Sequence, residues 1–248
     1  MTILVDTATA GTTLTGQVAI VTGAARGIGR CMALALAERG ARVAVVDILD
    51  PSETVNAVRD MGGEALGIEA DLTDPEAVGR AIAHTVKKFG GLNLLVNNAG
   101  LAPHGTGWPP LREMEPDFLE KVLRINLLSM FHTTRVALPH LTVAGNGRVI
   151  NMSGSGRRPR RGPYTISKAG VEELTRVFWE EERENGVVVT AFRPIMRIAL
   201  EYESEEVRSR RPGPESIIPH FLWTVSASAK EVGGKILHTD GAKLEAIE

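Results

Sequence analysis

The chain has 248 residues, 43% of them hydrophobic and 23% charged, and its formal net charge is -2. These values are typical of a globular protein with one sizeable core, and they exclude an intrinsically disordered chain or a fibrous repeat. The sequence has no broad basic field, no long apolar run and no basic leader, so we expect neither a nucleic-acid nor a membrane partner. It predicts a cytoplasmic protein that acts on small molecules.

Short runs rich in Val, Ile and Leu alternate along the chain with longer segments of helical periodicity. This alternation is typical of β–α units that build a parallel sheet, and it predicts the α/β fold class. We expect strands at residues 17–22, 42–47, 65–69, 92–97, 148–152, 187–192 and 235–238. Helices are expected near residues 28–39, 52–61, 75–89, 116–137, 164–184 and 215–226.

No low-complexity linker or repeat divides the chain, so we expect one domain at residues 15–248 after an N-terminal extension at 1–14. Asp74 before Pro75 is typical of a helix N-terminus, and Gly90 is typical of the end of the same helix. The segment ALEYESEEVRSRRPGP, which ends at Pro214, is highly charged and has few apolar residues. It predicts a surface excursion or a substrate lid, which we place near 195–214.

A glycine-rich turn joins the first predicted strand to the first predicted helix. The segment VAIVTGAARGIGR places Gly23, Gly27 and Gly29 there. Glycines allow a tight turn and close approach of the backbone, so a pyrophosphate could bind the N–H groups at the positive end of the helix dipole. The alternative is a turn that only lets the helix and the strand pack together.

Asp47 ends the second predicted strand, 24 residues after Gly23. A dinucleotide-binding unit needs an acceptor for the adenosine ribose hydroxyls at this place. The same carboxylate would repel a ribose 2′-phosphate, so NAD is favoured over NADP. Arg26 is the competing indication, because it could pair with any phosphate. Alternatively, Asp47 is an ordinary turn-forming residue that precedes Asp50.

Four motifs follow in order on the predicted elements: TGAARGIG at 22–29, NNAG at 97–100, Asn126 within RINLL, and YTISK at 164–168. Together they resemble the short-chain dehydrogenase/reductase family in its single-domain form, from about residue 14 to 241. The resemblance implies a doubly wound, Rossmann-type sheet of seven parallel strands with helices on both faces. The glycine spacing makes the sugar-nucleotide epimerase branch a poorer match.

The resemblance also implies which residues bind the cofactor: the glycine turn, the ribose acceptor, residues that border the adenine, residues behind the fourth strand, two side chains of YTISK and one proline. These are Gly23, Arg26, Gly27, Ile28, Gly29, Asp47, Asp71, Leu72, Asn98, Ala99, Gly100, Tyr164, Lys168 and Pro194. Alternatively, the NNAG segment is a polar end of a strand that does not contact a cofactor.

Tyr164 and Lys168 are four residues apart in a predicted helix, so both side chains project from one face. At about 4 to 5 Å and an effective dielectric near 20, the ammonium would contribute roughly 3 to 4 kcal/mol, enough to lower a tyrosine pKa by about 2 to 3. Tyr164 could then exchange a proton with an alcohol near neutral pH. The resemblance further implies that Lys168 bonds the nicotinamide ribose and that Asn126 holds a water for proton relay.

The serines are a departure from the family, which usually has a serine directly after the residue that matches Ser153. This chain has Gly154 there. Such a serine polarises the substrate oxygen, and losing one donor of this kind costs about 10² to 10³ in rate. Ser155, between two glycines, could bend into the site, whereas Ser153 could do so only if the strand end twists. We favour Ser155 narrowly over Ser153.

A second departure follows the sixth predicted strand. The family usually has Pro-Gly and then a threonine that contacts the nicotinamide amide, whereas this chain reads RPIMRIA. Pro194 matches, Ile195 replaces the glycine, and Ala199 stands near the threonine position. Because a β-branched residue disfavours positive φ, we expect an altered loop path and a weaker hold on the nicotinamide.

Other polar residues have two interpretations each. The basic run Arg157, Arg158, Arg160 and Arg161 could bind an anionic substrate, but we favour arginines that are solvated or paired with nearby acidic runs. His104 and Trp108 are substrate contacts or packing residues. The histidines are scattered without metal-ligand spacing, so we expect no metal.

The sequence therefore predicts an NAD(H)-dependent oxidoreductase that interconverts a secondary alcohol and a ketone. Tyr164 would be the acid/base, Lys168 its activator, Asn126 the relay and Ser155 the polariser. The alternative is a catalytically weak or inactive dinucleotide-binding subunit with a structural or regulatory role. The resemblance also implies a homodimer or homotetramer formed through the helices near 116–137 and 164–184.

Overall fold

A computed structural model describes residues 2–3, 13–103, 107–154 and 160–247. Among these residues nine strands form one sheet in the order β1-β9-β8-β7-β6-β5-β2-β3-β4. The seven predicted strands are present and parallel to one another. They are β2 (Val18–Thr22), β3 (Arg42–Asp47), β4 (Ala65–Glu69), β5 (Leu94–Asn97), β6 (Arg148–Met152), β7 (Val188–Pro194) and β8 (Ile236–Thr239). The predicted doubly wound α/β fold is confirmed.

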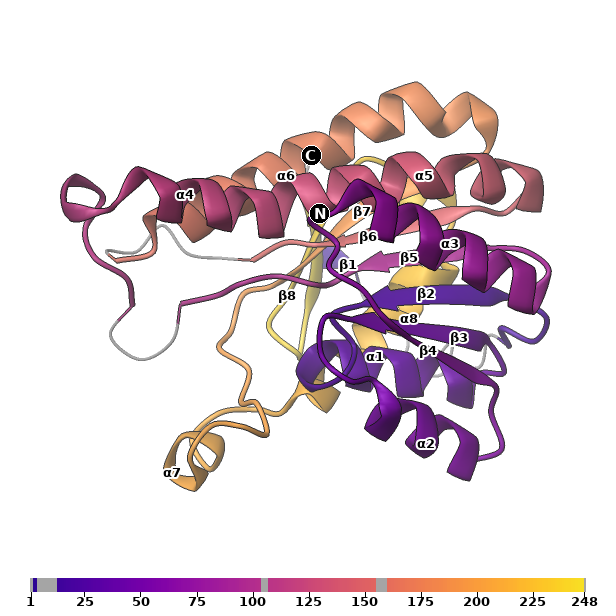
Figure 1. The fold of residues 1–248 in the computed structure, drawn as a ribbon, viewed down its shortest axis with the longest axis horizontal. Coiled ribbons are helices and arrows are strands. Elements are labelled where there is room, and N and C mark those ends of the chain that lie inside the picture. The colour runs from indigo at the N-terminus through magenta and orange to yellow at the C-terminus, as the bar shows by residue number, and fades with distance from the viewer. Residues whose placement is uncertain (1, 4–12, 104–106, 155–159, 248) are drawn as a thin grey trace.

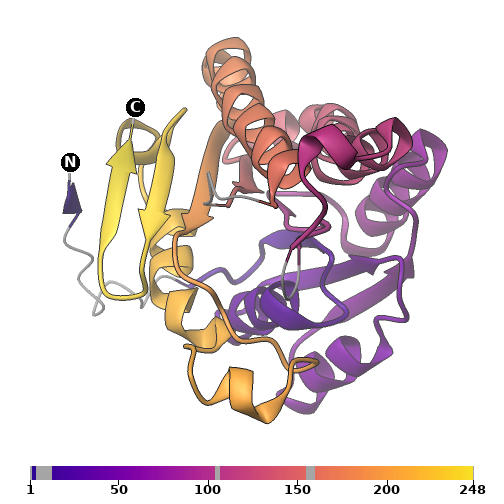
Figure 2. The same ribbon diagram turned by 90° about the vertical axis from the view of Figure 1, so that its left-hand side faces the viewer.

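The prediction of seven strands was wrong for the edge of the sheet. β9 (Leu244–Ile247) runs back antiparallel to β8, and the two-residue β1 (Thr2–Ile3) pairs antiparallel with β9, as Figure 2 shows. β1 has two residues, which is too few to give a periodic pattern. β9 pairs along the edge of β8, and β1 pairs along the edge that β9 then offers.

Helices cover both faces of the sheet in two layers (Figure 1). One layer consists of α1 (Gly27–Glu38), α2 (Ser52–Asp60) and α8 (Ile218–Ser226), and the other of α3 (Pro75–Phe89), α4 (Pro116–Leu123), α5 (Ser129–Ala144) and α6 (Gly162–Glu182). Side chains alternate between the two cores along each strand: Ala19 and Val21 pack on the α1 side, and Val18 and Ile20 on the other.

Shorter helices connect these elements. They are η2 (Leu111–Glu113), the π-helix η3 (Arg124–Leu128), η4 (Arg183–Asn185), α7 (Glu205–Arg208), η5 (Pro214–Ile217) and α9 (Ala229–Val232). The helix predicted near 116–137 is therefore divided by η3 and continues through Pro139 to Ala144. The predicted start of α3 is confirmed, since Asp74 accepts a hydrogen bond from the backbone N–H of Glu76.

The strand order reverses between β2 and β5, because the chain runs outward from β2 to β4 on one side and from β5 to β8 on the other. In doubly wound folds ligands bind in the crevice outside the carboxyl ends of the strands at this point. The loops after β2, β3, β5, β6 and β7 meet there. Within the described residues no helix is long and apolar enough to cross a membrane.

Candidate active site

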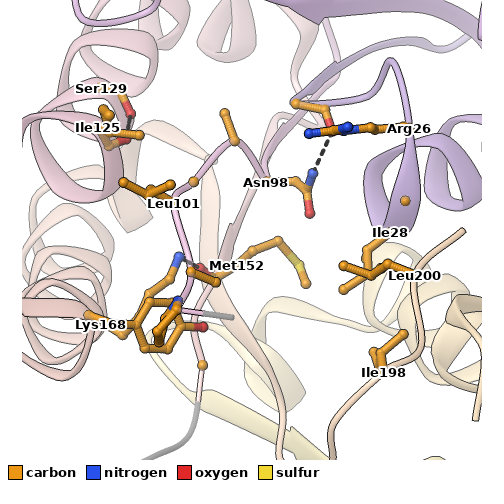
Figure 3. Close-up of a pocket in the computed structure, with 18 of the residues that line it drawn as sticks. Arg26, Ile28, Asn98, Leu101, Ile125, Ser129, Met152, Lys168, Ile198 and Leu200 are labelled. Carbon is orange, nitrogen blue, oxygen red and sulfur yellow. Dashed lines mark hydrogen bonds between the residues drawn. The ribbon is translucent and has the colours of Figure 1, made fainter. Parts of the chain in front are cut away.

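A cavity of about 750 Å³ opens at the carboxyl ends of the parallel strands (Figure 3). Most of the predicted site residues line it: Gly23, Arg26, Gly27, Ile28, Asp47, Asp71, Leu72, Asn98, Ala99, Gly100, Ser153, Tyr164, Lys168 and Pro194. Gly29 and Asn126 lie behind its wall, and Ser155 lies outside the described residues. The cavity thus brings together residues that are up to 171 positions apart in the sequence, from Gly23 to Pro194.

The glycine turn is packed closely against the NNAG segment. Gly23 has a φ of 63°, and a Cβ there would lie 2.7 Å from the Cα of Ala99. A Cβ on Gly29 would overlap the carbonyl oxygen of Gly23. Asn98 donates through its Nδ2 to the carbonyl oxygens of Thr22 and Gly23, at 3.0 and 2.9 Å. Gly23 and Gly29 are therefore required for packing, and the resulting turn forms the floor of the cavity.

Asp47 is buried at the end of β3 and faces the same cavity. Its Oδ2 accepts a hydrogen bond from the backbone N–H of Ala25 at 2.9 Å, and its Oδ1 accepts one from Leu49 at 3.0 Å. These two bonds fix the carboxylate between the glycine turn and the loop after β3. Each oxygen keeps a further lone pair with which to accept a ligand hydroxyl.

Lys168 is fully buried in α6, and its Nζ donates to the carbonyl oxygen of Met152 at 2.7 Å. Burial lowers the pKa of Lys168 from 10.5 to about 8. The nearby carboxylate of Glu172 has the opposite, smaller effect and raises this pKa. The Nζ lies 5.8 Å from the ring centroid of Tyr164. The predicted pairing of the two side chains on one face of the helix is thus present.

The prediction that the pKa of Tyr164 is lowered was wrong for the protein without a cofactor. Burial raises this pKa above its ordinary value, and the charge of Arg161 opposes the rise. The spacing of Tyr164 and Lys168 in the sequence indicates their proximity but carries no information on desolvation. In this buried site desolvation is the dominant cause.

Asn126 lies in the π-helix η3 and is buried. Its Oδ1 accepts from the backbone N–H of Leu101 at 2.6 Å, and its Nδ2 donates to the Leu101 carbonyl at 2.9 Å and to Ser167 Oγ at 3.0 Å. A Cβ on Gly100 would lie 3.3 Å from Asn126 Oδ1 and 3.7 Å from Lys168 Nζ. The side chain therefore joins the loop after NNAG to the helix that carries Tyr164.

The profile of the short chain dehydrogenase family matches residues 17–198. The chain belongs to this family. It is 32% identical over 240 residues to the cis-4-hydroxycyclohexanecarboxylate dehydrogenase of Sinomonas cyclohexanicum, covering 91% of this chain and 95% of that protein. It is 31% identical over 255 residues to the 2-dehydro-3-deoxy-D-gluconate 5-dehydrogenase of Escherichia coli K12, covering 93% and 96%.

Solved structures agree with this assignment. A dehydrogenase/reductase from Sinorhizobium meliloti 1021 superimposes with a TM-score of 0.83 at 28% identity and covers 94% of this chain and 97% of its own. A short chain dehydrogenase from Mycobacterium avium gives the same TM-score at 32% identity, with 95% and 86% covered. The fold of this short-chain dehydrogenase is thus similar to theirs along almost the whole chain.

Ser153 is held by a polar network that the sequence analysis did not identify. Its Oγ donates to Glu172 Oε1 at 2.6 Å, and Arg193 Nη1 donates to the same oxygen at 2.6 Å. A serine hydroxyl has one proton, so Ser153 cannot donate to a substrate while it keeps this bond. The available signal was the position of Glu172 four residues after Lys168, on the same helix face.

Gly154, where the family usually has serine, lies against the hydroxyl end of the Tyr164 side chain. A Cβ at this position would overlap the hydroxyl oxygen of Tyr164 and would lie 2.8 Å from its Cζ. The tyrosine hydroxyl therefore occupies the space that a side chain at residue 154 would need. The absence of a serine here and the position of Tyr164 depend on each other.

The segment after β7 adopts ordinary backbone geometry despite its departure from Pro-Gly. β7 extends to Pro194, and the N–H of Ile195 donates to the Thr239 carbonyl at 2.8 Å. Among the described residues only Arg160 combines a side chain with positive φ, so Ile195 needs no glycine conformation. Ala199 is buried and offers no hydroxyl to a nicotinamide amide.

The remaining candidates divide between the cavity and its surroundings. Arg161 lines the cavity, whereas Arg157, Arg158 and His104 lie outside the described residues. Trp108 packs edge-on against Phe118 with centroids 5.1 Å apart, which indicates a packing role. In the described parts of the chain no group of three or more His, Cys, Asp or Glu side chains is arranged to hold a metal ion.

Proposed function

We propose that this short-chain dehydrogenase is an NAD(H)-dependent oxidoreductase that interconverts a secondary alcohol and a ketone. The observation that carries the proposal is the composition of the cavity. Asp47 and the glycine turn line one part of it, and Tyr164 and Lys168 line another. A dinucleotide that bonds Asp47 through its adenosine ribose would extend towards Tyr164, where a proton has to be exchanged.

Tyr164 and the residues around it would transfer the substrate proton and hold the charges that this transfer requires. When the dinucleotide is bound, its nicotinamide supplies the hydride acceptor or donor. The Tyr164 hydroxyl would take the alcohol proton during oxidation and return it during reduction. With a pKa of about 8, Lys168 carries its positive charge at pH 7, and this charge favours the ionised phenol. Asn126 would keep the Leu101 loop and α6 in place around the reacting groups.

The choice of NAD over NADP rests on the charge of Asp47. We expect NADH to bind wild type at least tenfold more tightly than NADPH, because the buried carboxylate repels a 2′-phosphate. Asp47→Asn should narrow this difference in a fluorescence titration with both cofactors. Asp50→Asn removes the same charge from an exposed position and should change neither affinity. Tighter binding of NADPH by the wild type would contradict this assignment.

The substrate screen should include hydroxy acids and keto acids. Two relatives are named for substrates that carry a carboxylate. In this chain Arg161 lines the cavity, and its charge acts on Tyr164. Turnover of secondary alcohols or their ketones with NAD(H) would support the proposed function.

An inactive or weak dinucleotide-binding subunit is the second candidate. It is favoured by the polar network around Ser153, whose hydroxyl donates to Glu172, and by the glycine at position 154. Without a donor from either position the substrate oxygen is poorly polarised. Tight NADH binding without turnover of any alcohol or ketone in the screen would favour this candidate.

We further propose that the protein forms a homodimer or homotetramer in the cytoplasm. Leu128 in η3 and Ile166 and Val177 in α6 are large apolar side chains that are 44 to 46% exposed. Pairing of these helices between subunits would cover them. Light scattering coupled to size-exclusion chromatography would distinguish a monomer from either assembly.

A further inference from the structure

The segment after β7 contacts the glycine turn at consecutive positions. Glu201 Oε1 accepts a hydrogen bond from the backbone N–H of Gly27 at 2.7 Å. The guanidinium of Arg26 lies 4.3 Å from the ring centroid of Tyr202. Leu200 lies beside the same turn, since its Cδ2 is 3.5 Å from the place of a Cβ on Gly27. In Figure 3 Ile28 and Leu200 lie next to each other on the side of the cavity opposite Lys168.

Gly27 is the first residue of α1, so its N–H has no partner within the helix and lies at the positive end of the helix dipole. In the proposed function this is where the pyrophosphate of the dinucleotide binds. A carboxylate and a phosphate are both anions that accept hydrogen bonds from N–H groups. Glu201 therefore satisfies the donor that the pyrophosphate would use, and its charge repels the same group.

We propose that Glu201 competes with the cofactor pyrophosphate for the N-terminus of α1. The proposal rests on the proposed function, and it adds that this segment has to release Gly27 before the dinucleotide binds. Glu201 thereby sets the affinity for the cofactor. Since Arg26 is stacked on Tyr202, the same release would free a guanidinium next to the phosphates.

The segment keeps its own shape through contacts that do not involve the glycine turn. Glu203 Oε2 accepts from the backbone N–H of Leu200 at 3.0 Å, and Glu203 Oε1 accepts from Arg211 Nη1 at 3.1 Å. The N–H of Ala199 donates to the Pro212 carbonyl at 2.8 Å. Releasing Gly27 therefore requires the loss of the Glu201 bond and the neighbouring side-chain contacts, but not the unfolding of the segment.

The test is a binding titration of Glu201→Gln and Glu201→Ala with three probes: NADH, ADP-ribose and adenosine. We expect both variants to bind NADH and ADP-ribose about three- to tenfold more tightly than wild type, because Gln has no charge to repel the pyrophosphate and Ala removes the competing acceptor as well. The factor is modest since Glu201 is exposed and its charge is screened. Adenosine has no pyrophosphate, so its affinity should not change. Glu205→Gln removes a charge from the same segment without a contact to the turn and is the matched control.

The outcomes separate this proposal from the proposed function. Equal NADH affinities in wild type, Glu201→Gln and Glu201→Ala would overturn the proposal that Glu201 competes with the pyrophosphate. The proposed function as a dinucleotide-binding enzyme would still stand. Weaker binding by the variants would overturn it too, because the carboxylate would then assist the cofactor. Failure of every variant to bind NADH or NADPH would remove the proposed function and the competition together.

Limited proteolysis tests the contact without any cofactor. Trypsin cleaves after arginine, and Arg208 and Arg210 lie in the same segment as Glu201. Glu201→Ala should be cleaved there several-fold faster than Glu205→Gln, because a segment without its bond to the glycine turn opens locally more often. Equal cleavage rates in the two variants would contradict the proposal.

Discussion

The two ends of the cavity are built differently. Around Tyr164, the polar groups are held by the buried core: Lys168 by the carbonyl of Met152, and Asn126 by both backbone groups of Leu101. At the glycine turn, the covering contacts come from Glu201 and Tyr202, both exposed. The comparison indicates that the groups proposed to react can move only if the core is disturbed, whereas the end proposed to bind the dinucleotide can open at little cost in stability.

Removal of the buried charge should have the largest effect. We expect Lys168→Met to lower turnover by about 10² to 10⁴, since the proposed acid/base Tyr164 loses the cation that favours its ionised form. The same variant should be more stable than wild type at pH 7 by about 1 to 3 kcal/mol, because burial of the charged lysine opposes folding. Urea unfolding and steady-state kinetics measure the two effects, and Lys87→Met on an exposed helix face is the control.

The pH dependence of this stability difference gives a check of its sign. The pKa of Lys168 is about 8 in the folded protein and 10.5 as its ordinary value. Between these values the unfolded chain holds a proton that the folded chain lacks, so the stability of the wild type rises with pH. The advantage of Lys168→Met should therefore shrink from pH 8 towards pH 10.5. An advantage that grows over this range would contradict the assignment.

Serine at position 154, which is the usual family residue, should lower activity because it disturbs the Tyr164 end of the cavity. Gly154→Ser places a Cβ in the space of the Tyr164 hydroxyl. We expect turnover to fall about a hundredfold, because a displacement of the reacting group by about 1 Å costs that much. Gly79→Ala, at a helix position with open space around it, should leave turnover unchanged. An increase in turnover on Gly154→Ser would show that the missing donor matters more than the position of Tyr164.

Removal of the Glu172 carboxylate, which accepts from Ser153 and Arg193 and lies near Lys168, should have a smaller effect. Glu172 raises the pKa of Lys168, so Glu172→Gln should lower that pKa further below 8. The loss of turnover on the alkaline side should then begin at lower pH, with a several-fold decrease near pH 8. Glu173→Gln, which removes a charge from an exposed neighbour, should keep the wild-type profile. A profile that moves to higher pH in Glu172→Gln would contradict this role.

The same division explains what the sequence could predict. Tyr164 and Lys168 form a pattern within one helix, and the glycines and Asp47 follow buried strands, so local spacing indicates where each lies. The bond from Gly27 to Glu201 joins residues 174 positions apart, and Ser153, Glu172 and Arg193 meet from three elements. No local pattern encodes such contacts. The pKa of Tyr164 depends on burial, which residue spacing does not report.

The most direct test of the account compares wild type with Tyr164→Phe in two measurements on the same preparations. The substitution removes the hydroxyl that we propose as the acid/base and leaves the aromatic ring in place. We predict NADH binding within about threefold of wild type and turnover of a secondary alcohol lowered by about 10² to 10⁴. Unchanged turnover in Tyr164→Phe would contradict the central claim that this phenol exchanges the substrate proton.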